Sequence, residues 1–184
     1  MERIIIAKDG TSFLVREPKI SDVNSFMEMF NKVVNEPGIG LNRSKKVTLK
    51  EEKEWLKSSI VKIKKNEEIM LLIEKDGKIV GNSTLERRSM CTKEAHTATF
   101  GITLAKEVRN KGLGQRIIPI LIKLARKRMK GLEIIELEVF SRNKPAYHVY
   151  EKMGFRKVAV IPNKAKEKRN YVDSIVMQKY LKKI

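Results

Sequence analysis

Arg109-Asn110-Lys111-Gly112-Leu113-Gly114, residues 109–114, is the stretch that decides how this chain is interpreted. It lies between a strand-like segment, about residues 96–104, and an amphipathic segment that predicts a helix from about 112 to 131. Glycine at 112 and 114 permits tight backbone geometry and the close approach of a ligand. The first N–H groups of a helix have no partner inside the helix and point towards an anion bound there. The stretch therefore predicts a loop that holds a phosphate group.

The loop differs from two familiar phosphate-binding motifs. No Gly-Lys-Ser/Thr follows it, as a P-loop requires, and it lacks the three-glycine dinucleotide fingerprint. Arg109 and Lys111 place positive charge beside it. The expected helix carries further cations on its polar side: Arg116, Lys123, Arg126, Lys127 and Lys130. These charges favour an anionic ligand at this position.

Outward from this loop, hydrophobic periodicity and turn signals predict the other elements. The expected order is β-α-α-β-β-β-α-β-α-β-β, a mixed α/β domain that occupies residues 1–184. The expected strands are 11–18, 69–75, 78–86, 96–104, 134–139, 155–161 and 171–179, and the expected helices are 23–34, 48–65, 112–131 and 145–153. Pro119 falls inside the third helix, where it removes one backbone hydrogen bond, so a kink or a looser start is expected there.

The composition limits the class of protein. The chain has 184 residues and a net charge of +18, from 40 Lys+Arg against 22 Asp+Glu, which suits either an anionic partner or a solvated basic surface. No stretch approaches the roughly 18 consecutive apolar residues of a membrane helix. The N-terminus is too short and too quickly charged for a secretory signal. Cys91 is the only cysteine, which excludes an internal disulfide. These absences together favour the cytoplasm.

The surrounding pattern resembles the GNAT superfamily of acyl-CoA-dependent N-acyltransferases. Its signature is [Gln/Arg]-x-x-Gly-x-[Gly/Ala] after a strand; residues 109–114 fit it fully, and Gly101-Ile102-Thr103-Leu104 matches the strand before it. The resemblance covers roughly residues 12–180 and is specific over 98–156. It implies a central mixed, mostly antiparallel sheet of six to seven strands, flanked by four helices and splayed at the cofactor site.

The resemblance also implies acetyl-CoA as co-substrate. The backbone at Ile102 and Leu104 would pair with the pantetheine arm like an extra strand, and backbone amides from Arg109 to Gln115 would cradle the pyrophosphate. The full set of expected cofactor-binding residues is Ile102, Thr103, Leu104, Arg109, Asn110, Lys111, Gly112, Leu113, Gly114, Gln115, Asn143 and Lys152. No metal site is expected, because two scattered histidines and one cysteine give no ligand spacing.

Acetyl transfer to an amine requires a neutral amine, a polarised thioester carbonyl and a stabilised leaving thiolate. Leu137-Glu138-Val139, followed by Asn143 and Tyr150, resembles the ribosomal-protein alanine N-acetyltransferase branch. In that branch the residue matching Glu138 is the general base, that matching Asn143 contacts the cofactor, and that matching Tyr150 is the general acid. Tyr150-Glu151-Lys152-Met153-Gly154-Phe155 also resembles the superfamily's motif at the end of this helix.

Alternatives remain open for each role. Glu136 shares a strand face with Glu138 and is expected on a solvated face, which is also the alternative for Glu138. His96, or a chain of waters, could replace Glu138 as base. Tyr147 lies one turn before Tyr150 and is the second candidate for the acid, and Tyr150 itself could be a core tyrosine.

Three functions remain open. The first is an N-acetyltransferase in which a protein N-terminus or lysine attacks acetyl-CoA directly in a ternary complex. The second has the same chemistry with a small amine, such as a polyamine or an aminoglycoside, although the basic surface repels polycations. The third is a basic nucleic-acid-binding module, disfavoured because no zinc-finger, RNA-binding or helix-turn-helix motif is recognisable and only 6% of residues are aromatic. A homodimer is compatible with the sequence.

Overall fold

The computed structural model of the chain describes residues 1–34, 36, 43, 45–167 and 169–182. Within these residues, eight strands form one sheet in the order β1-β2-β3-β4-β5-β6-β8-β7. The strands are β1 (Glu2–Ile6), β2 (Ser12–Arg16), β3 (Glu68–Lys75), β4 (Lys78–Arg87), β5 (Thr97–Leu104), β6 (Ile134–Phe140), β7 (Arg156–Glu167) and β8 (Asn170–Tyr180). The helices of the described residues are α1 (Val23–Val34), α2 (Leu49–Lys64), α3 (Leu113–Arg128) and α4 (Lys144–Lys152), with 3₁₀ turns η1 (Ile20–Asp22) and η2 (Lys106–Val108).

The expected mixed α/β class and mostly antiparallel sheet are confirmed, since every neighbouring strand pair except β5–β6 is antiparallel. The expected count of six to seven strands is wrong by one. The additional strand is β1, which pairs along its whole length with β2 at the edge of the sheet. In β1 buried and exposed side chains alternate, since Ile5 is buried while Ile4 and Ile6 are exposed. Because all three residues are isoleucine, the sequence does not show the alternation of apolar and polar residues that predicts a strand.

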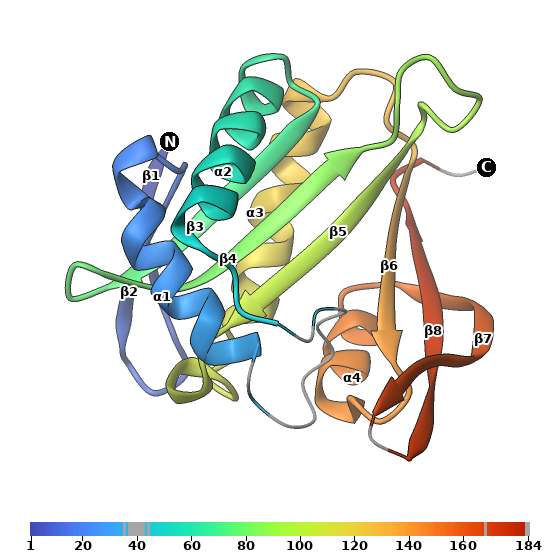
Figure 1. The fold of residues 1–184 in the computed structure, drawn as a ribbon. Coiled ribbons are helices and arrows are strands. Elements are labelled where there is room, and N and C mark those ends of the chain that lie inside the picture. Colours follow the sequence, from blue (N-terminus) through green and yellow to red (C-terminus); the bar gives the residue numbers. More distant parts are fainter. Residues whose placement is uncertain (35, 37–42, 44, 168, 183–184) are drawn as a thin grey trace.

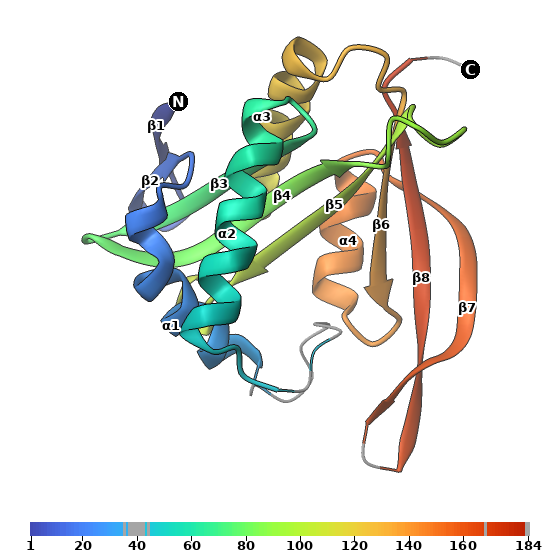
Figure 2. The ribbon, with the colours of Figure 1, turned by 45° about the horizontal axis from the view of Figure 1, so that its top comes forward.

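Helices cover both faces of the sheet (Figures 1 and 2). An ion pair between Lys62 and Glu86 joins α2 to β4 on one face. On the other face the ring of Tyr150 in α4 packs against Phe100 in β5, at 5.9 Å between ring centroids. These contacts assign the alternating residues of the central strands to one face or the other. The core fills the space between sheet and helices, as the complete burial of Leu56 and Ile117 shows.

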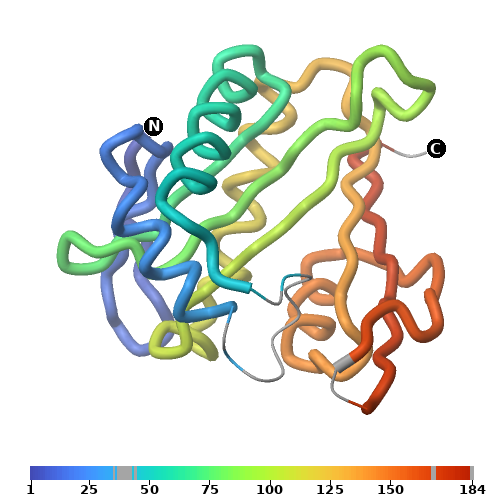
Figure 3. Tube along the Cα trace, viewed as in Figure 1, coloured from blue at the N-terminus to red at the C-terminus, as the bar shows by residue number. Residues whose placement is uncertain are grey.

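The only parallel strand pair in the described sheet, β5–β6, is joined along part of its length. The ladder pairs Thr97 with Ile134, Ala98 with Ile135 and Thr99 with Glu136, and then ends. Both strands continue past this point, β5 to Leu104 and β6 to Phe140. They diverge in Figures 1 and 3. The expected splay is therefore confirmed, and we call the opening beyond Thr99 and Glu136 the fork.

The helix ends follow the sequence signals closely. Thr48 and Glu51 form the expected capping box at the start of α2, with the Glu51 N–H donating to Thr48 Oγ1 at 3.3 Å and the Thr48 N–H donating to Glu51 Oε2 at 2.7 Å. Pro119 lies inside α3, which runs without a break from Leu113 to Arg128. The missing Pro119 N–H is thus tolerated at an exposed position of the helix.

Arg16 ties the edge of the sheet to the start of α1. Its guanidinium makes two 2.8 Å hydrogen bonds to the carboxylate of Asp22 and a 2.9 Å hydrogen bond to Glu74 on β3. All three side chains are less than one fifth exposed. Burial opposes ionisation of Asp22, but the hydrogen bonds from Arg16 and from the Lys19 N–H, together with the charges of Arg16 and Lys19, outweigh it and lower the pKa of this carboxyl.

We expect Arg16→Met to lower the free energy of unfolding by about 2–4 kcal/mol at neutral pH, because it leaves two part-buried carboxylates without their partner. A folded-state pKa below the unfolded value gives stability that is present above about pH 4 and is lost as the pH falls further. The difference from the wild type should therefore shrink below about pH 4. Urea titrations at several pH values measure it. Lys62→Met, which removes the exposed ion pair with Glu86, is the control and should cost under about 1 kcal/mol.

Candidate active site

The predicted phosphate loop has an unusual backbone that explains its sequence. Asn110 and Gly112 both have positive φ, at 60° and 76°, a conformation that asparagine and glycine tolerate best. Gly112 is the N-cap of α3, and no described side chain makes a capping hydrogen bond there. The first N–H groups of α3 therefore have no side-chain acceptor. A phosphate group would fit this position, since it would receive the hydrogen bonds that a cap normally accepts.

The guanidinium of Arg109 is already engaged. Its Nε and Nη2 atoms donate to the carbonyl oxygen of Leu104 at 2.9 and 2.7 Å, and Nη1 forms an ion pair with Glu36 at 2.6 Å. Arg109 thus fixes the chain between β5 and α3. Both lone pairs of the Leu104 carbonyl are occupied, so the backbone of Leu104 could offer a pantetheine arm only its N–H group.

Lys111 is paired as well. Its Nζ lies 2.9 Å from the carboxylate of Asp9, in the turn between β1 and β2. The hydrogen bond from Lys111, followed by those from Thr11, lowers the pKa of the Asp9 carboxyl to about 2, so Asp9 is ionised throughout the neutral range. The expectation that Arg109 and Lys111 add charge for an anion therefore needs a correction, because each cation is balanced by a carboxylate.

Two other loop positions differ from the expectation of ligand contact. The side chain of Leu113 is 1% exposed and belongs to the core, so only its backbone could reach a ligand. A Cβ on Gly114 would lie 3.2 Å from Val149 of α4, which shows that this glycine permits close packing of α3 on α4. The side chain of Gln115 is half-buried in the first turn.

The strand before the loop provides the expected surface for a pantetheine arm. Ile102 and Thr103 are half-buried and lie beyond the end of the β5–β6 ladder. The backbone groups of Ile102 and Leu104 face the fork, whereas those of Thr103 face Asn82 on β4. Beside Thr103, on β4, the buried Oδ1 atom of Asn82 has no hydrogen-bond partner among the described residues. An orphaned buried acceptor costs about 1–3 kcal/mol.

Tyr150 lies at the fork on the face covered by α3 and α4. Its ring is 8% exposed and packs edge-on against Phe100 and Phe155. Phe100 is the first residue of β5 beyond the ladder with β6. Burial raises the pKa of Tyr150 to about 12, and its hydroxyl has no hydrogen-bond partner among the described residues. The hydroxyl therefore stays protonated at neutral pH and keeps its proton available.

Glu138 lies at the fork on the opposite face, two residues beyond the last ladder position of β6. Its carboxylate is 48% exposed, accepts a 3.0 Å hydrogen bond from Ser174 and lies 3.7 Å from Lys164. Glu136, expected on a solvated face, is instead held by Arg88 at 2.5 Å and by Gln178 at 2.7 Å and is 19% exposed. Of the two carboxylates, Glu138 is the one left accessible at the fork.

The remaining expected residues have other surroundings. Asn143 is the N-cap of α4, with its Oδ1 accepting from the N–H of Ala146 at 3.3 Å. Lys152 is exposed in the last turn of α4. Tyr147 is half-buried, and burial together with Glu151 raises the pKa of its hydroxyl. His96 precedes the ladder, about 13 Å along β5 from Phe100, too far to act at the fork.

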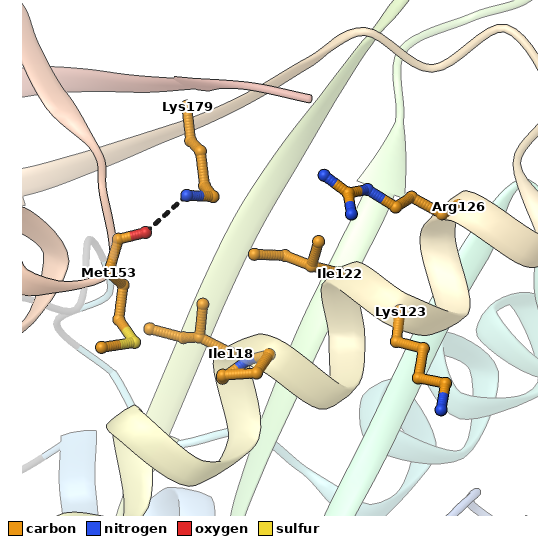
Figure 4. A pocket seen from close by; sticks show the side chains of 7 residues that line it. Ile118, Ile122, Lys123, Arg126, Met153 and Lys179 are labelled. Atoms are coloured by element: carbon orange, nitrogen blue, oxygen red, sulfur yellow. Dashed lines mark hydrogen bonds between the residues drawn. The ribbon is translucent and has the colours of Figure 1, made fainter. Parts of the chain in front are cut away.

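A cavity of about 480 Å³ runs along the later turns of α3 (Figure 4). Its walls are apolar and its charged residues are basic: the lining comprises Ile118, Pro119, Ile122, Lys123, Arg126, Met153 and Lys179. The ammonium of Lys179 donates to the carbonyl oxygen of Met153 at 2.7 Å. None of the sequence-predicted site residues lines this cavity.

The phosphate loop also has neighbours that sequence reasoning missed: Lys8, Asp9 and Glu36. Asp9 and Glu36 hold the cations of the motif, and Lys8 lies across Gly112. No local pattern marks these residues, because each reaches the loop through a contact between distant parts of the chain.

The sequence model of the acetyltransferase (GNAT) family matches residues 35–155, and the chain belongs to this family. It is thus an acetyl-CoA-dependent N-acetyltransferase, as the resemblance implied. An L-amino acid N-acetyltransferase of Escherichia coli, AaaT, is 30% identical over 102 residues, which span 55% of this chain and 62% of that protein. An N-alpha-acetyltransferase of Sulfurisphaera tokodaii is 25% identical over 164 residues, 84% of this chain and 87% of that one.

Solved structures share the fold. An acetyltransferase of Salmonella typhimurium, solved with acetyl-CoA, superposes with a TM-score of 0.80 at 18% identity, covering 94% of this chain and 95% of that one. The ribosomal-protein-alanine N-acetyltransferase of Brucella melitensis gives 0.79 at 19% identity, covering 91% and 99%. Within the described part of the chain, no helix is long and apolar enough to cross a membrane, and no group of three or more acidic, histidine or cysteine side chains could hold a metal ion.

Replacing Gly112 with alanine tests the loop. The new Cβ strains a backbone at φ 76° and meets the Lys8 side chain at 2.9 Å. We expect acetyl-CoA to bind more weakly by about 1–3 kcal/mol, because the N–H groups that hold the phosphates move. Calorimetry gives the affinity. Gly131→Ala is the matched control, since Gly131 has the same φ and nothing within 4 Å of a Cβ. Equal affinities of the two folded variants would remove the loop from the site.

Proposed function

We propose that this enzyme acetylates the α-amino group of a polypeptide N-terminus, by direct attack of the amine on acetyl-CoA in a ternary complex. The observation that carries the proposal is the arrangement at the fork. Tyr150 lies on one face of the sheet and Glu138 on the other, and the unpaired edge of β5 runs between them. A thioester held along that edge has a proton donor on one side and a carboxylate on the side open to the acceptor.

Tyr150 is proposed to stabilise the departing sulfur. A thiol with an ordinary pKa of about 8.5 is a stronger acid than a tyrosine whose pKa is raised to about 12. Full proton transfer from Tyr150 to the thiolate is therefore uphill, whereas a hydrogen bond from the hydroxyl to the developing negative charge is favourable. The surrounding rings of Phe100 and Phe155 exclude water and strengthen this hydrogen bond.

Glu138 is proposed as the base. The acceptor amine is protonated at neutral pH and must lose a proton before its nitrogen attacks the carbonyl carbon. The carboxylate of Glu138 is exposed enough to take that proton directly or through a water. The C–N bond forms as the C–S bond breaks. The attacking nitrogen releases its second proton to solvent. Coenzyme A leaves as a thiolate that accepts the hydrogen bond from Tyr150 and then takes a proton from solvent.

The cofactor contacts follow from the same geometry. The N–H groups at the start of α3 are proposed to bind the pyrophosphate, and the backbone of Ile102 and the N–H of Leu104 to pair with the pantetheine arm. A backbone N–H on this strand can polarise the thioester carbonyl. Asn143 and Lys152 remain proposed cofactor contacts. Since the Oδ1 of Asn143 accepts one hydrogen bond as the cap of α4, its NH₂ group and the second lone pair of Oδ1 are available for that purpose.

The α-amino acceptor is supported by the relatives. The protein of Sulfurisphaera tokodaii is an N-alpha-acetyltransferase and the protein of Escherichia coli is an L-amino acid N-acetyltransferase, so both names point to an α-amino group. The longer match is to the N-alpha-acetyltransferase, which favours a polypeptide. The net charge of the chain is +18, which favours an acidic peptide because opposite charges attract the peptide to the enzyme. A free amino acid is the second candidate.

We expect Tyr150→Phe to lower kcat by about 10²–10³-fold, because the substitution deletes only the hydrogen-bond donor. Since the hydroxyl has no described partner, the melting temperature and the affinity for acetyl-CoA should hardly change. Tyr147→Phe, one turn earlier on α4, is the matched control and should retain activity. Intact turnover in Tyr150→Phe, or a loss confined to Tyr147→Phe, would assign the donor role elsewhere.

We expect Glu138→Gln to lower the rate at neutral pH by about 10²–10⁴-fold, because no carboxylate is left to take the proton of the amine. Activity should recover as the pH rises and the amine loses its proton to solvent. Glu136→Gln is the control on the same strand face; it should cost stability through the lost Arg88 ion pair without this pH-dependent recovery. Near-normal rates for Glu138→Gln would favour a water chain as the base.

A side-by-side turnover screen tests the acceptor. Acidic peptides with a free α-amine should turn over best. The same peptides with a blocked N-terminus and an internal lysine should react poorly, as should polyamines and aminoglycosides. Faster turnover of a lysine side chain or a polyamine than of any α-amine would overturn the proposed acceptor and leave the acetyltransferase chemistry intact.

A further inference from the structure

We infer that Lys8, in the turn between β1 and β2, binds the pyrophosphate of acetyl-CoA together with the N-terminus of α3. The inference rests on the proposed cofactor site and adds to it a residue about a hundred positions away in the chain. Figures 1 and 3 show the β1–β2 turn beside the segment that joins β5 to α3.

The turn is fixed to the loop through its backbone. The N–H of Lys8 donates to the carbonyl oxygen of Lys111 at 3.0 Å. Within the turn, the N–H of Ala7 donates to the Thr11 carbonyl at 2.9 Å, and the N–H of Thr11 donates to the Asp9 carboxylate at 3.1 Å. Asp9 then pairs with Lys111 at 2.9 Å. These bonds join turn and loop into one unit, so the direction of the Lys8 side chain is set by the same contacts that shape the loop.

The side chain of Lys8 lies across Gly112. A Cβ at Gly112 would come within 2.9 Å of Lys8 Cε, 3.0 Å of Cγ and 3.1 Å of Cδ. Glycine at this position therefore permits the left-handed backbone conformation and also leaves room for the aliphatic part of the Lys8 side chain. Since the stem passes directly over the N-cap of α3, the ammonium is carried into the region where the free N–H groups of that helix begin.

The charges around the loop single out this lysine. Arg109 is balanced by Glu36, and Lys111 is balanced by Asp9. Lys8 forms no ion pair with any described residue, and its side chain is exposed. A bound pyrophosphate would therefore lie near Arg109 and Lys111, whose charges are balanced by carboxylates, and near the ammonium of Lys8, whose charge no described residue balances. Asp9 acts as a positioning residue, since it holds both the turn and Lys111.

The test compares acetyl donors that differ in their phosphates. We expect Lys8→Ala to raise the KM for acetyl-CoA and its Kd by roughly 3- to 10-fold, the effect of one solvent-screened charge contact, with kcat nearly unchanged. The same loss should appear with 3′-dephospho-acetyl-CoA and disappear with acetylpantetheine, which has no pyrophosphate. Lys8→Arg should restore most of the affinity. Lys57→Ala, an exposed lysine on α2 across the sheet, is the control.

The outcomes separate this inference from the function on which it rests. Unchanged affinity of Lys8→Ala for acetyl-CoA would overturn the role of Lys8 alone. An equal loss with acetylpantetheine would also overturn it, because the lysine would then act through the shape of the loop. A loss that depends on the 3′-phosphate would reject the pyrophosphate as its ligand. Failure of the wild-type protein to bind acetyl-CoA at all would instead reject the proposed cofactor site.

Discussion

The site depends on a pairing that stops early. β5 and β6 are parallel neighbours joined by three residue pairs, and beyond Thr99 and Glu136 they no longer pair with each other, although β5 stays paired with β4 and β6 with β8. Backbone groups in a closed sheet satisfy one another, and no ligand can reach them. At the fork they face an opening instead. A flat, fully paired sheet with the same sequence motifs would offer no strand edge to a pantetheine arm and no gap for a thioester.

The helices α3 and α4 lie beside the fork, and α4 places Tyr150 there. α4 follows directly on β6 and packs close to α3, an approach that the missing side chain of Gly114 permits. Tyr150 is thereby inserted between Phe100 and Phe155, where burial raises its pKa to about 12. Glu138, on the same connected segment but on the other face, stays accessible to solvent. The unit formed by β6 and α4 thus places a buried tyrosine on one face of the sheet and a solvent-accessible carboxylate on the other.

The electrostatics of the phosphate loop differ from what its composition suggests. A net charge of +18 makes a basic loop appear unremarkable, yet both motif cations are neutralised by carboxylates from other parts of the chain. Their structural task is to fix the loop between β5 and α3. In the proposed cofactor site, the groups that attract the anion are then the backbone N–H groups of α3 and the ammonium of Lys8, which forms no ion pair with any described residue.

The sequence by itself determined the family, the mixed α/β class and the local structures whose causes are local. The capping box at Thr48 and Glu51 and the left-handed positions at Asn110 and Gly112 lie within a few residues of their partners, so a sequence pattern records them. Only the tertiary structure decided β1 as an edge strand, the end of the β5–β6 ladder, and the pairing of Lys111 with Asp9. These features join residues far apart in the chain, and their geometry depends on how whole elements pack, which no short stretch of sequence specifies.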